Sequence, residues 1–181
     1  MRIGVLSIQG DVSEHLSIVE KALKEMNIGG NAVPVKNSLG VDALIIPGGE
    51  STAIFKVMQK TGLSDKIKKV NIPVMGTCAG CVLMDRKHLG LMDMDVERNA
   101  FGRQKESFEA DIKIKGFRKD YHGVFIRAPV ITKVYGECRV LAKFEDRIVM
   151  VQENNRIALS FHPELTNDTR IHKYFLSLIK Q

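Results

Sequence analysis

The stretch Val74 to Met84, VMGTCAGCVLM, places a cysteine between two glycines at the junction of two apolar runs. A nucleophile on a sharp turn between a strand and a helix needs a strained backbone and small neighbours, a requirement met by the pattern Gly-x-nucleophile-x-Gly. The segment GTCAG at 76–80 has this pattern. It predicts that Cys78 projects from such a turn, at a helix start whose amide groups and dipole favour the thiolate.

Two other interpretations of this stretch remain open. A buried cysteine between glycines can serve only the close packing of a helix on a strand. Cys78 and Cys81 also form a C-x-x-C pair at a helix start, which is typical of thioredoxin-like redox proteins. The sequence has no second C-x-x-C pair, so a zinc site of four cysteines is excluded.

Strand and helix patterns alternate through the first half of the chain. Residues 2–9 form an apolar run, and apolar residues then recur at intervals of three and four from Val12 to Met26. Asp11 and Glu14 have the spacing of a capping box at the start of this helix. Further short apolar runs alternate with segments of helical spacing; the runs lie at 31–36, 43–46 and 72–75, and the helical segments at 51–60 and after Cys81. This order predicts an α/β fold with an open, mostly parallel sheet flanked by helices on both faces.

The second half of the chain reads as strands with a final helix. Residues 106–114 alternate apolar and polar side chains, 123–129 is a strand candidate, and three apolar runs follow between 140 and 161. These patterns predict antiparallel strands added to the sheet. We expect a last helix at about 168–179. No linker or repeat interrupts the chain, so we expect residues 1–181 to form a single domain.

The composition narrows the function classes. The chain has 181 residues, of which 44% are hydrophobic and 27% charged, as in a compact domain. Its net charge of +6 comes from scattered lysines and arginines without interleaved aromatic residues, so we expect no nucleic-acid partner. No apolar run reaches the roughly 20 residues needed to span a bilayer. We therefore expect a cytoplasmic protein without membrane association, with its three cysteines reduced.

A candidate base for Cys78 lies near the C-terminus, in the segment SFHPEL at 160–165. A cysteine hydrolase needs a histidine base, and a carboxylate two residues later in an extended chain can orient the imidazole. His162 and Glu164 meet this requirement. A His-x-Glu pair is common on protein surfaces, so the assignment rests on its occurrence together with the turn at Cys78.

A candidate oxyanion site lies at 47–52, PGGEST, after an apolar run. Its glycines allow backbone amides to approach a ligand closely, as does the amide of Ala79 after the nucleophile. The segment lacks the Gly-Lys-Ser/Thr ending of a phosphate-binding loop. A glycine-rich turn between a strand and a helix is the alternative interpretation.

Five motifs occur together in a fixed order: PGGEST (47–52), GTCAG (76–80), ERNAFGRQKESFE (97–109), GVFIRAP (123–129) and SFHPELT (160–166). Together they resemble the class I, triad-type glutamine amidotransferases, and among these the glutaminase subunits of pyridoxal 5′-phosphate synthase. The resemblance runs from 5–15 to the last helix and implies a flavodoxin-like fold.

The resemblance implies a role for each matching residue. Cys78 would attack the side-chain amide of glutamine, and His162, held by Glu164, would transfer the protons. Gly49 and Ala79 would donate to the oxyanion. The residues implied to hold glutamine are Gly49, Glu50, Ser51, Arg98, Ile126 and Arg127.

The resemblance also implies a partner. Ammonia would pass to a (β/α)8-barrel synthase subunit, no cofactor or metal would be needed, and activity would be low before docking. The segment 9–11, QGD, would lie near this partner and the oxyanion site.

The chain departs from the family pattern in two ways. The segment between Cys81 and Leu89 is shorter than usual, so we expect the helix after Cys78 to end early. Cys81 replaces an aliphatic residue, and we expect that oxidation can link it to Cys78. Two other functions remain open: an amidotransferase of imidazole glycerol phosphate or GMP synthesis, and a stress or binding protein in which His162 and Arg98 have no role.

Overall fold

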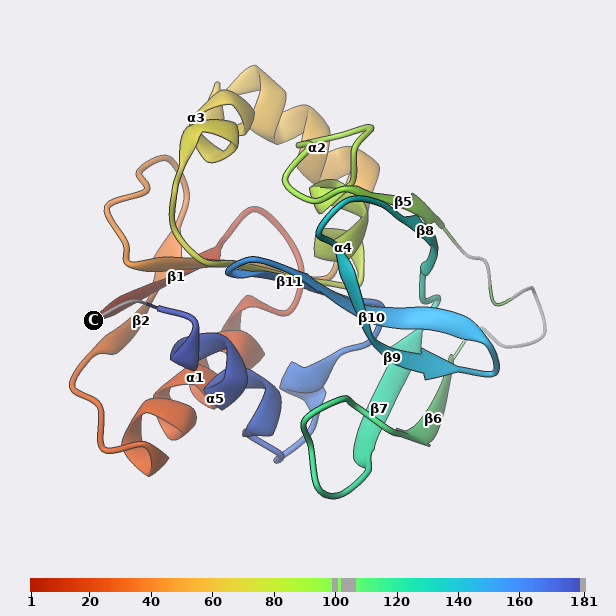
Figure 1. Cartoon of the computed structure of the whole chain (residues 1–181). Coiled ribbons are helices and arrows are strands. Elements are labelled where there is room, and N and C mark those ends of the chain that lie inside the picture. Colours follow the sequence, from red (N-terminus) through yellow and green to blue (C-terminus); the bar gives the residue numbers. More distant parts are fainter. Residues whose placement is uncertain (99–100, 102–106, 180–181) are drawn as a thin grey trace.

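A central sheet with helices on both faces forms most of the structure, a computed structural model that describes residues 1–98, 101 and 107–179 (Figure 1). Within these residues the sheet runs in the order β2-β1-β3-β4-β11-β10-β8-β5, with β9 paired to β10. Its strands are β1 (Arg2–Leu6), β2 (Asn31–Val35), β3 (Ala43–Ile46), β4 (Val74–Thr77), β5 (Met94–Glu97), β8 (Val130–Val134), β9 (Arg139–Phe144), β10 (Arg147–Glu153) and β11 (Arg156–Leu159).

The parallel half of the sheet has the order β2-β1-β3-β4-β11. This order is that of a flavodoxin-like, doubly wound fold, in which ligands bind beyond the carboxyl ends of the strands. The predicted α/β class and parallel sheet are therefore confirmed. The strands are apolar on both sides because both faces are covered; Ile45 on β3 and Val74 on β4 are fully buried.

Helices cover each face with an apolar stripe. On one face lie α1 (Val12–Glu25) and α5 (Arg170–Ser177); on the other lie α2 (Ser51–Lys60), α3 (Leu63–Lys69) and α4 (Ala79–Met84) (Figure 1). Val19 of α1 and Phe175 of α5 belong to one buried core, and Ile54 of α2 and Ile67 of α3 belong to the other. Among the described residues, no helix combines the length and apolar character that crossing a bilayer requires.

The antiparallel half differs from the prediction in two respects. The last of the three predicted antiparallel runs forms β11, which pairs in parallel with β4 and is antiparallel only to β10. β10 pairs with β11, β9 and β8, and β8 pairs with β5, as expected of strands added to the sheet. The strands β6 (Ser107–Ile112) and β7 (Tyr121–Ile126) instead form a separate two-stranded sheet. Aromatic packing holds this hairpin in place: Phe108 stacks on Phe125 with ring centroids 4.6 Å apart, and Phe108 lies 5.2 Å from Phe144 of β9.

Several predicted boundaries need correction. The capping box at α1 is wrong, since the Asp11 side chain makes no cap hydrogen bond and Ser13 donates to the Glu14 carboxylate instead. The last helix ends at Ser177 rather than 179. The helix α3 and the strands β5 and β8 were not predicted. The expectation of a short helix after Cys78 is confirmed, because α4 ends at Met84.

The turn between β4 and α4 has the predicted strained backbone. Cys78 has φ 48° and ψ −106°, a conformation that L-residues rarely adopt. A Cβ atom on Gly80 would lie 1.9 Å from the backbone oxygen of Ile46, and one on Gly76 would lie 2.6 Å from the oxygen of Gly80. The two glycines therefore allow α4 to pack directly on β3 and β4.

We predict that Gly80→Ala lowers the free energy of unfolding by about 2 kcal/mol or more, because the new methyl group meets rigid backbone. The control is Gly40→Ala, at an exposed position where an added Cβ has no neighbour within 4 Å. Chemical denaturation of both variants measures the difference. Equal stabilities would contradict the close packing of α4 on β3.

Candidate functional site

The carboxyl ends of four parallel strands surround one cavity of about 580 Å³. Residues 9–11 follow β1, 49–51 follow β3, Cys78 and Ala79 follow β4, and His162 lies beyond β11. The cavity is lined by Gln9, Gly10, Asp11, Gly49, Glu50, Ser51, Cys78, Ala79, Val82, Arg98, Ile126, Arg127, Pro129 and His162. The fold thus brings every predicted site residue to this cavity except Glu164, which lies behind His162.

Cys78 lies at the base of the cavity with only 9% of its surface exposed. Its backbone N–H donates to the oxygen of Leu159 on β11 at 2.8 Å, which ties the turn to the neighbouring strand. Its sulfur lies 3.8 Å from the backbone oxygen of Ile126 at the end of β7. The thiol is therefore held between the central sheet and the hairpin.

Two carboxylates contact the same ring nitrogen of His162. Its Nδ1 lies 2.7 Å from Oε1 of Glu164 and 3.2 Å from Oδ2 of Asp11. The ring also packs on Gly48, where a Cβ atom would come within 2.6 Å of the imidazole carbon Cε1. These contacts leave Nε2 as the free ring nitrogen, without a hydrogen bond to any residue that the structure describes.

The protonation of His162 depends on Cys78 and Glu164. Burial disfavours the charged ring, but interactions with Cys78 and Glu164 outweigh it and raise the pKa of His162 to about 10. The imidazole is thus positively charged at neutral pH. A positive charge beside a sulfur favours the thiolate, which is the nucleophilic form.

The link between His162 and Glu164 forms in a way the sequence did not indicate. We expected an extended segment, but Pro163–Leu165 is a 3-10 helix. Its tight turn folds the Glu164 carboxylate back onto His162, and burial then raises the pKa of Glu164. The predicted pairing is confirmed, and the predicted backbone geometry is wrong.

The contact of Asp11 with His162 was not predicted. The capping interpretation assigned the Asp11 carboxylate to the helix, whereas it lies 3.2 Å from the imidazole. Gln9 also reaches the site, because its Oε1 accepts from the backbone N–H of Glu50 at 3.4 Å. The segment 9–11 was expected near the oxyanion site, and its position after a parallel strand is the physical reason it lies there.

The outer wall of the cavity carries charged side chains. Glu50 caps α2 by accepting from the amides of Thr52 and Ala53, and these bonds lower its pKa. Arg98 donates from Nη1 to Oγ1 of Thr52 at 2.7 Å and lies 3.8 Å from Glu50. The rest of the 97–109 motif lies largely outside the described residues, at 99–100 and 102–106.

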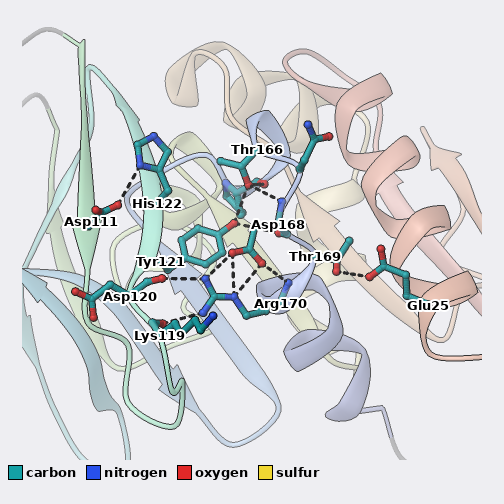
Figure 2. Close-up of polar contacts among 12 residues, drawn as sticks. Glu25, Asp111, Lys119, Asp120, Tyr121, His122, Thr166, Asp168, Thr169 and Arg170 are labelled. Atoms are coloured by element: carbon teal, nitrogen blue, oxygen red, sulfur yellow. Dashed lines mark hydrogen bonds and ion pairs between the residues drawn. The ribbon is translucent and has the colours of Figure 1, made fainter.

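A polar network anchors the turn that carries His162 and Glu164 (Figure 2). The Tyr121 hydroxyl lies 3.1 Å from Oγ1 of Thr166, directly after the turn. Arg170 binds the carboxylate of Asp168 and donates to the backbone oxygens of Lys119 and Asp120. The network joins α5 to the hairpin and so fixes the segment between them.

Two buried histidines lie behind Glu164. His15 of α1 places Nε2 3.3 Å from Oε2 of Glu164 and 3.1 Å from Oγ1 of Thr77. Its Nδ1 lies 3.4 Å from Nε2 of His172 on α5. Both rings are fully buried; burial lowers the pKa of His15 well below its usual value and that of His172 to about 3. Both are therefore neutral at pH 7.

The other two cysteines are buried thiols. Cys81 is fully buried in the core beneath α4, and burial raises its pKa well above the usual range. Burial likewise raises the pKa of Cys138 to about 12. All three thiols are free, so a link between Cys78 and Cys81 under oxidation stays a prediction.

One group of described residues has the composition of a metal site: Asp11, His162 and Glu164, whose ligand atoms lie within 4.8 Å of one another. Both carboxylates, however, face the same nitrogen, Nδ1 of His162. A proton on this nitrogen satisfies both, and a cation would have to displace it. The geometry therefore favours an oriented imidazole.

Comparisons with known proteins agree on one family. The model of the SNO glutamine amidotransferase family matches residues 5–181. A protein of Brevibacillus brevis named pyridoxal 5′-phosphate synthase subunit PdxT is 49% identical, with 100% of this chain and 98% of that protein covered. Its namesake from Methanosphaera stadtmanae is also 49% identical, over 96% of this chain and 94% of that protein. A crystal structure of a glutamine amidotransferase aligns with a TM-score of 0.84 and 42% identity over 98% of both chains.

We predict that the stability provided by His172 is lost in acid. Its pKa is about 3 in the folded chain and near 6.5 in the unfolded chain, so the unfolded state binds the proton first as the pH falls. The free energy of unfolding of the wild type relative to His172→Gln should therefore fall by about 3 kcal/mol between pH 7 and pH 4.

The matched control is His122→Gln on the hairpin. Hydrogen bonds that the His122 ring donates to Glu109 and Asp111 raise the pKa of His122, so its contribution should instead grow as the pH falls. Urea denaturation at several pH values measures both differences. Parallel curves for the wild type and His172→Gln would show that His172 is not held neutral.

Proposed function

Because this chain belongs to the SNO glutamine amidotransferase family, we propose that it hydrolyses the side-chain amide of L-glutamine to glutamate and ammonia. The ammonia is used by a synthase partner that makes pyridoxal 5′-phosphate, in line with the names of relatives that are 49% identical. One observation carries the chemistry: residues 84 positions apart, Cys78 and His162, line the same cavity, and Glu164 binds the far side of the imidazole.

In the first half-reaction, the Cys78 thiolate attacks the amide carbon of glutamine. The C–N bond breaks as the imidazolium of His162 gives its Nε2 proton to the departing nitrogen, which leaves as ammonia. The raised pKa of His162, about 10, supports this role because the ring holds a proton at neutral pH. The product is a γ-glutamyl thioester on Cys78.

In the second half-reaction, water replaces the sulfur. His162, now neutral, takes a proton from water, and the hydroxide attacks the thioester carbon. Glutamate leaves, and the proton restores the charged pair of Cys78 and His162. Glu164 accepts from Nδ1 throughout, which keeps Nε2 directed into the cavity. These steps require no cofactor or metal.

The oxyanion formed in each half-reaction needs backbone donors. We assign this role to the amides of Gly49 and Ala79, which line the cavity beside Cys78. Gly49 has φ 135°, a conformation that favours glycine. Gly10 packs closely on Gly48, because a Cβ atom on Gly10 would lie 1.8 Å from the backbone oxygen of Gly48. This packing places the 47–50 turn directly against Gly10.

Glutamine is bound by the outer wall of the cavity. The Glu50 carboxylate supplies a charge suited to the substrate ammonium, and the Arg98 guanidinium one suited to the carboxylate. Ser51, Ile126 and Arg127 complete the wall. Charges of both signs on one wall fit an amino-acid zwitterion.

The partner we propose is a (β/α)8-barrel synthase subunit that receives ammonia. Residues 1–181 act as one glutaminase domain in this complex. Three free cysteines fit a reducing compartment, so the complex acts in the cytoplasm.

We predict that Cys78→Ala lowers glutamate release by about 10⁴-fold or more, because the covalent step has no substitute nucleophile. Cys138→Ala removes a thiol in the core and should leave the rate unchanged. Glutamate release is measured with and without the synthase subunit. Activity in folded Cys78→Ala would refute the thioester mechanism.

We predict that Arg98→Met raises the KM for glutamine about tenfold and changes kcat little, since Arg98 contacts the substrate carboxylate and not the reacting amide. Arg139→Met, on an exposed strand position paired with Glu137, is the control. Steady-state kinetics in the complex separate the two constants. An unchanged KM would remove Arg98 from the binding site.

A further inference from the structure

The carboxylate of Glu164 has one oxygen that the proposed mechanism does not use. Oε1 accepts from His162, whereas Oε2 faces away from the cavity and is fully buried. Its nearest polar neighbour given by the structure is Nε2 of His15, at 3.3 Å, and no described residue gives Oε2 a standard hydrogen bond. A buried carboxylate oxygen with so little support depends strongly on this one neighbour.

His15 also touches the turn that carries the nucleophile. Its Nε2 lies 3.1 Å from Oγ1 of Thr77, the residue directly before Cys78. Thr77 and His15 are both fully buried. The His15 imidazole of α1 therefore contacts two residues of the site. One is Glu164, in the turn after β11, which supports the base; the other is Thr77, at the end of β4, which precedes the nucleophile.

The tautomer of His15 follows from its neighbours. The ring is neutral, so one nitrogen carries a hydrogen and the other a lone pair. Glu164 Oε2 can only accept, so the hydrogen belongs on Nε2. The lone pair on Nδ1 then accepts from Nε2–H of His172 at 3.4 Å, and Nδ1 of His172 is left without a partner among the described residues. With this assignment, no two lone pairs face each other between Glu164, His15 and His172.

We propose that His15 is a positioning residue, which directs its Nε2–H toward both Glu164 Oε2 and Thr77 and so keeps the Glu164 carboxylate ionised and aligned with His162. His172 in turn holds the His15 ring in the required tautomer. The proposal rests on the proposed function insofar as the aligned imidazole serves glutamine hydrolysis.

The proposal predicts the direction of a pH effect. The groups facing Glu164 are His162 and Asp11 on one side and His15 on the other. Loss of the His15 dipole makes the ionised carboxylate less stable, so Glu164 takes up a proton at a higher pH. Once it is neutral, His162 loses the charge that supports its own, and the positive charge beside the Cys78 sulfur is weakened. The acid limb of Cys78 reactivity therefore moves to higher pH.

The test compares His15→Met with His15→Gln. Methionine fills the space without a donor, whereas the glutamine amide nitrogen can reach the position of Nε2–H. In the complex with the synthase subunit, His15→Met should lower kcat for glutamine about tenfold, change KM less than about twofold and shift the acid limb up by about one pH unit. His15→Gln should recover most of kcat, and His122→Gln on the exposed hairpin should match the wild type.

Alkylation of Cys78 by iodoacetamide as a function of pH gives a second readout that needs neither glutamine nor the partner. If the wild-type complex releases no glutamate, the proposed function fails, and the alkylation profiles still test His15. A folded His15→Met protein with wild-type kcat and alkylation profile overturns the proposal. A loss of kcat without a shift of the acid limb, or without recovery in His15→Gln, shows a merely structural role and also overturns it.

If His15→Met fails to fold, as shown by the absence of a cooperative unfolding transition, nuclear magnetic resonance of the wild type decides which tautomer His15 has. Nitrogen chemical shifts of the histidine rings distinguish the two neutral tautomers. A hydrogen on Nε2 of His15 supports the proposal. A hydrogen on Nδ1 overturns it, because no donor would then face Glu164.

Discussion

The close contact of α4 with β3 and β4 is the constraint on which the site depends. Only glycine fits at position 80, against the Ile46 oxygen, and this contact sets the start of α4 one residue after Cys78. The chain must therefore turn within a single residue, which forces Cys78 into its strained backbone conformation. The cost is met by packing on both sides of the turn. The result is a sulfur held at the base of the cavity instead of in the core, where Cys81 lies.

Three buried histidines near this turn have different protonation states. His162 has two carboxylates at Nδ1 and a thiol nearby, so its charge is stabilised despite burial. Burial keeps His15 and His172 neutral, even though the Glu164 carboxylate lies 3.3 Å from His15. The same side chain thus acts as a charged group toward the cavity and as a neutral support behind it. The partners that each fold element supplies, and not the residue type, decide which role a histidine takes.

Much of this arrangement could be predicted from the sequence, where the physics is local. The glycines around Cys78 indicate a tight turn, because a strained turn between a strand and a helix needs neighbours without side-chain bulk. The alternation of apolar runs with helical segments indicates the parallel sheet. Predictions failed where a distant contact outweighed a local pattern. Asp11 has the spacing of a helix cap, but its carboxylate lies against His162, 151 positions away. Phe108 lies in a strand pattern, yet its hairpin packs on the main sheet through Phe144 of β9 and does not join it. The local pattern around His15 gives no sign of its role, because its partners come from three other elements.

The early end of α4 bears on how such chains change length during evolution. After Met84 the chain turns at once, and the buried Asp85 carboxylate accepts from the amides of Lys87 and His88 and from the His88 ring. These local hydrogen bonds close the segment, and none of them involves a residue that lines the cavity. The pairing of β4 with β11, which positions Cys78 and His162, therefore does not depend on the length of the segment between α4 and β5.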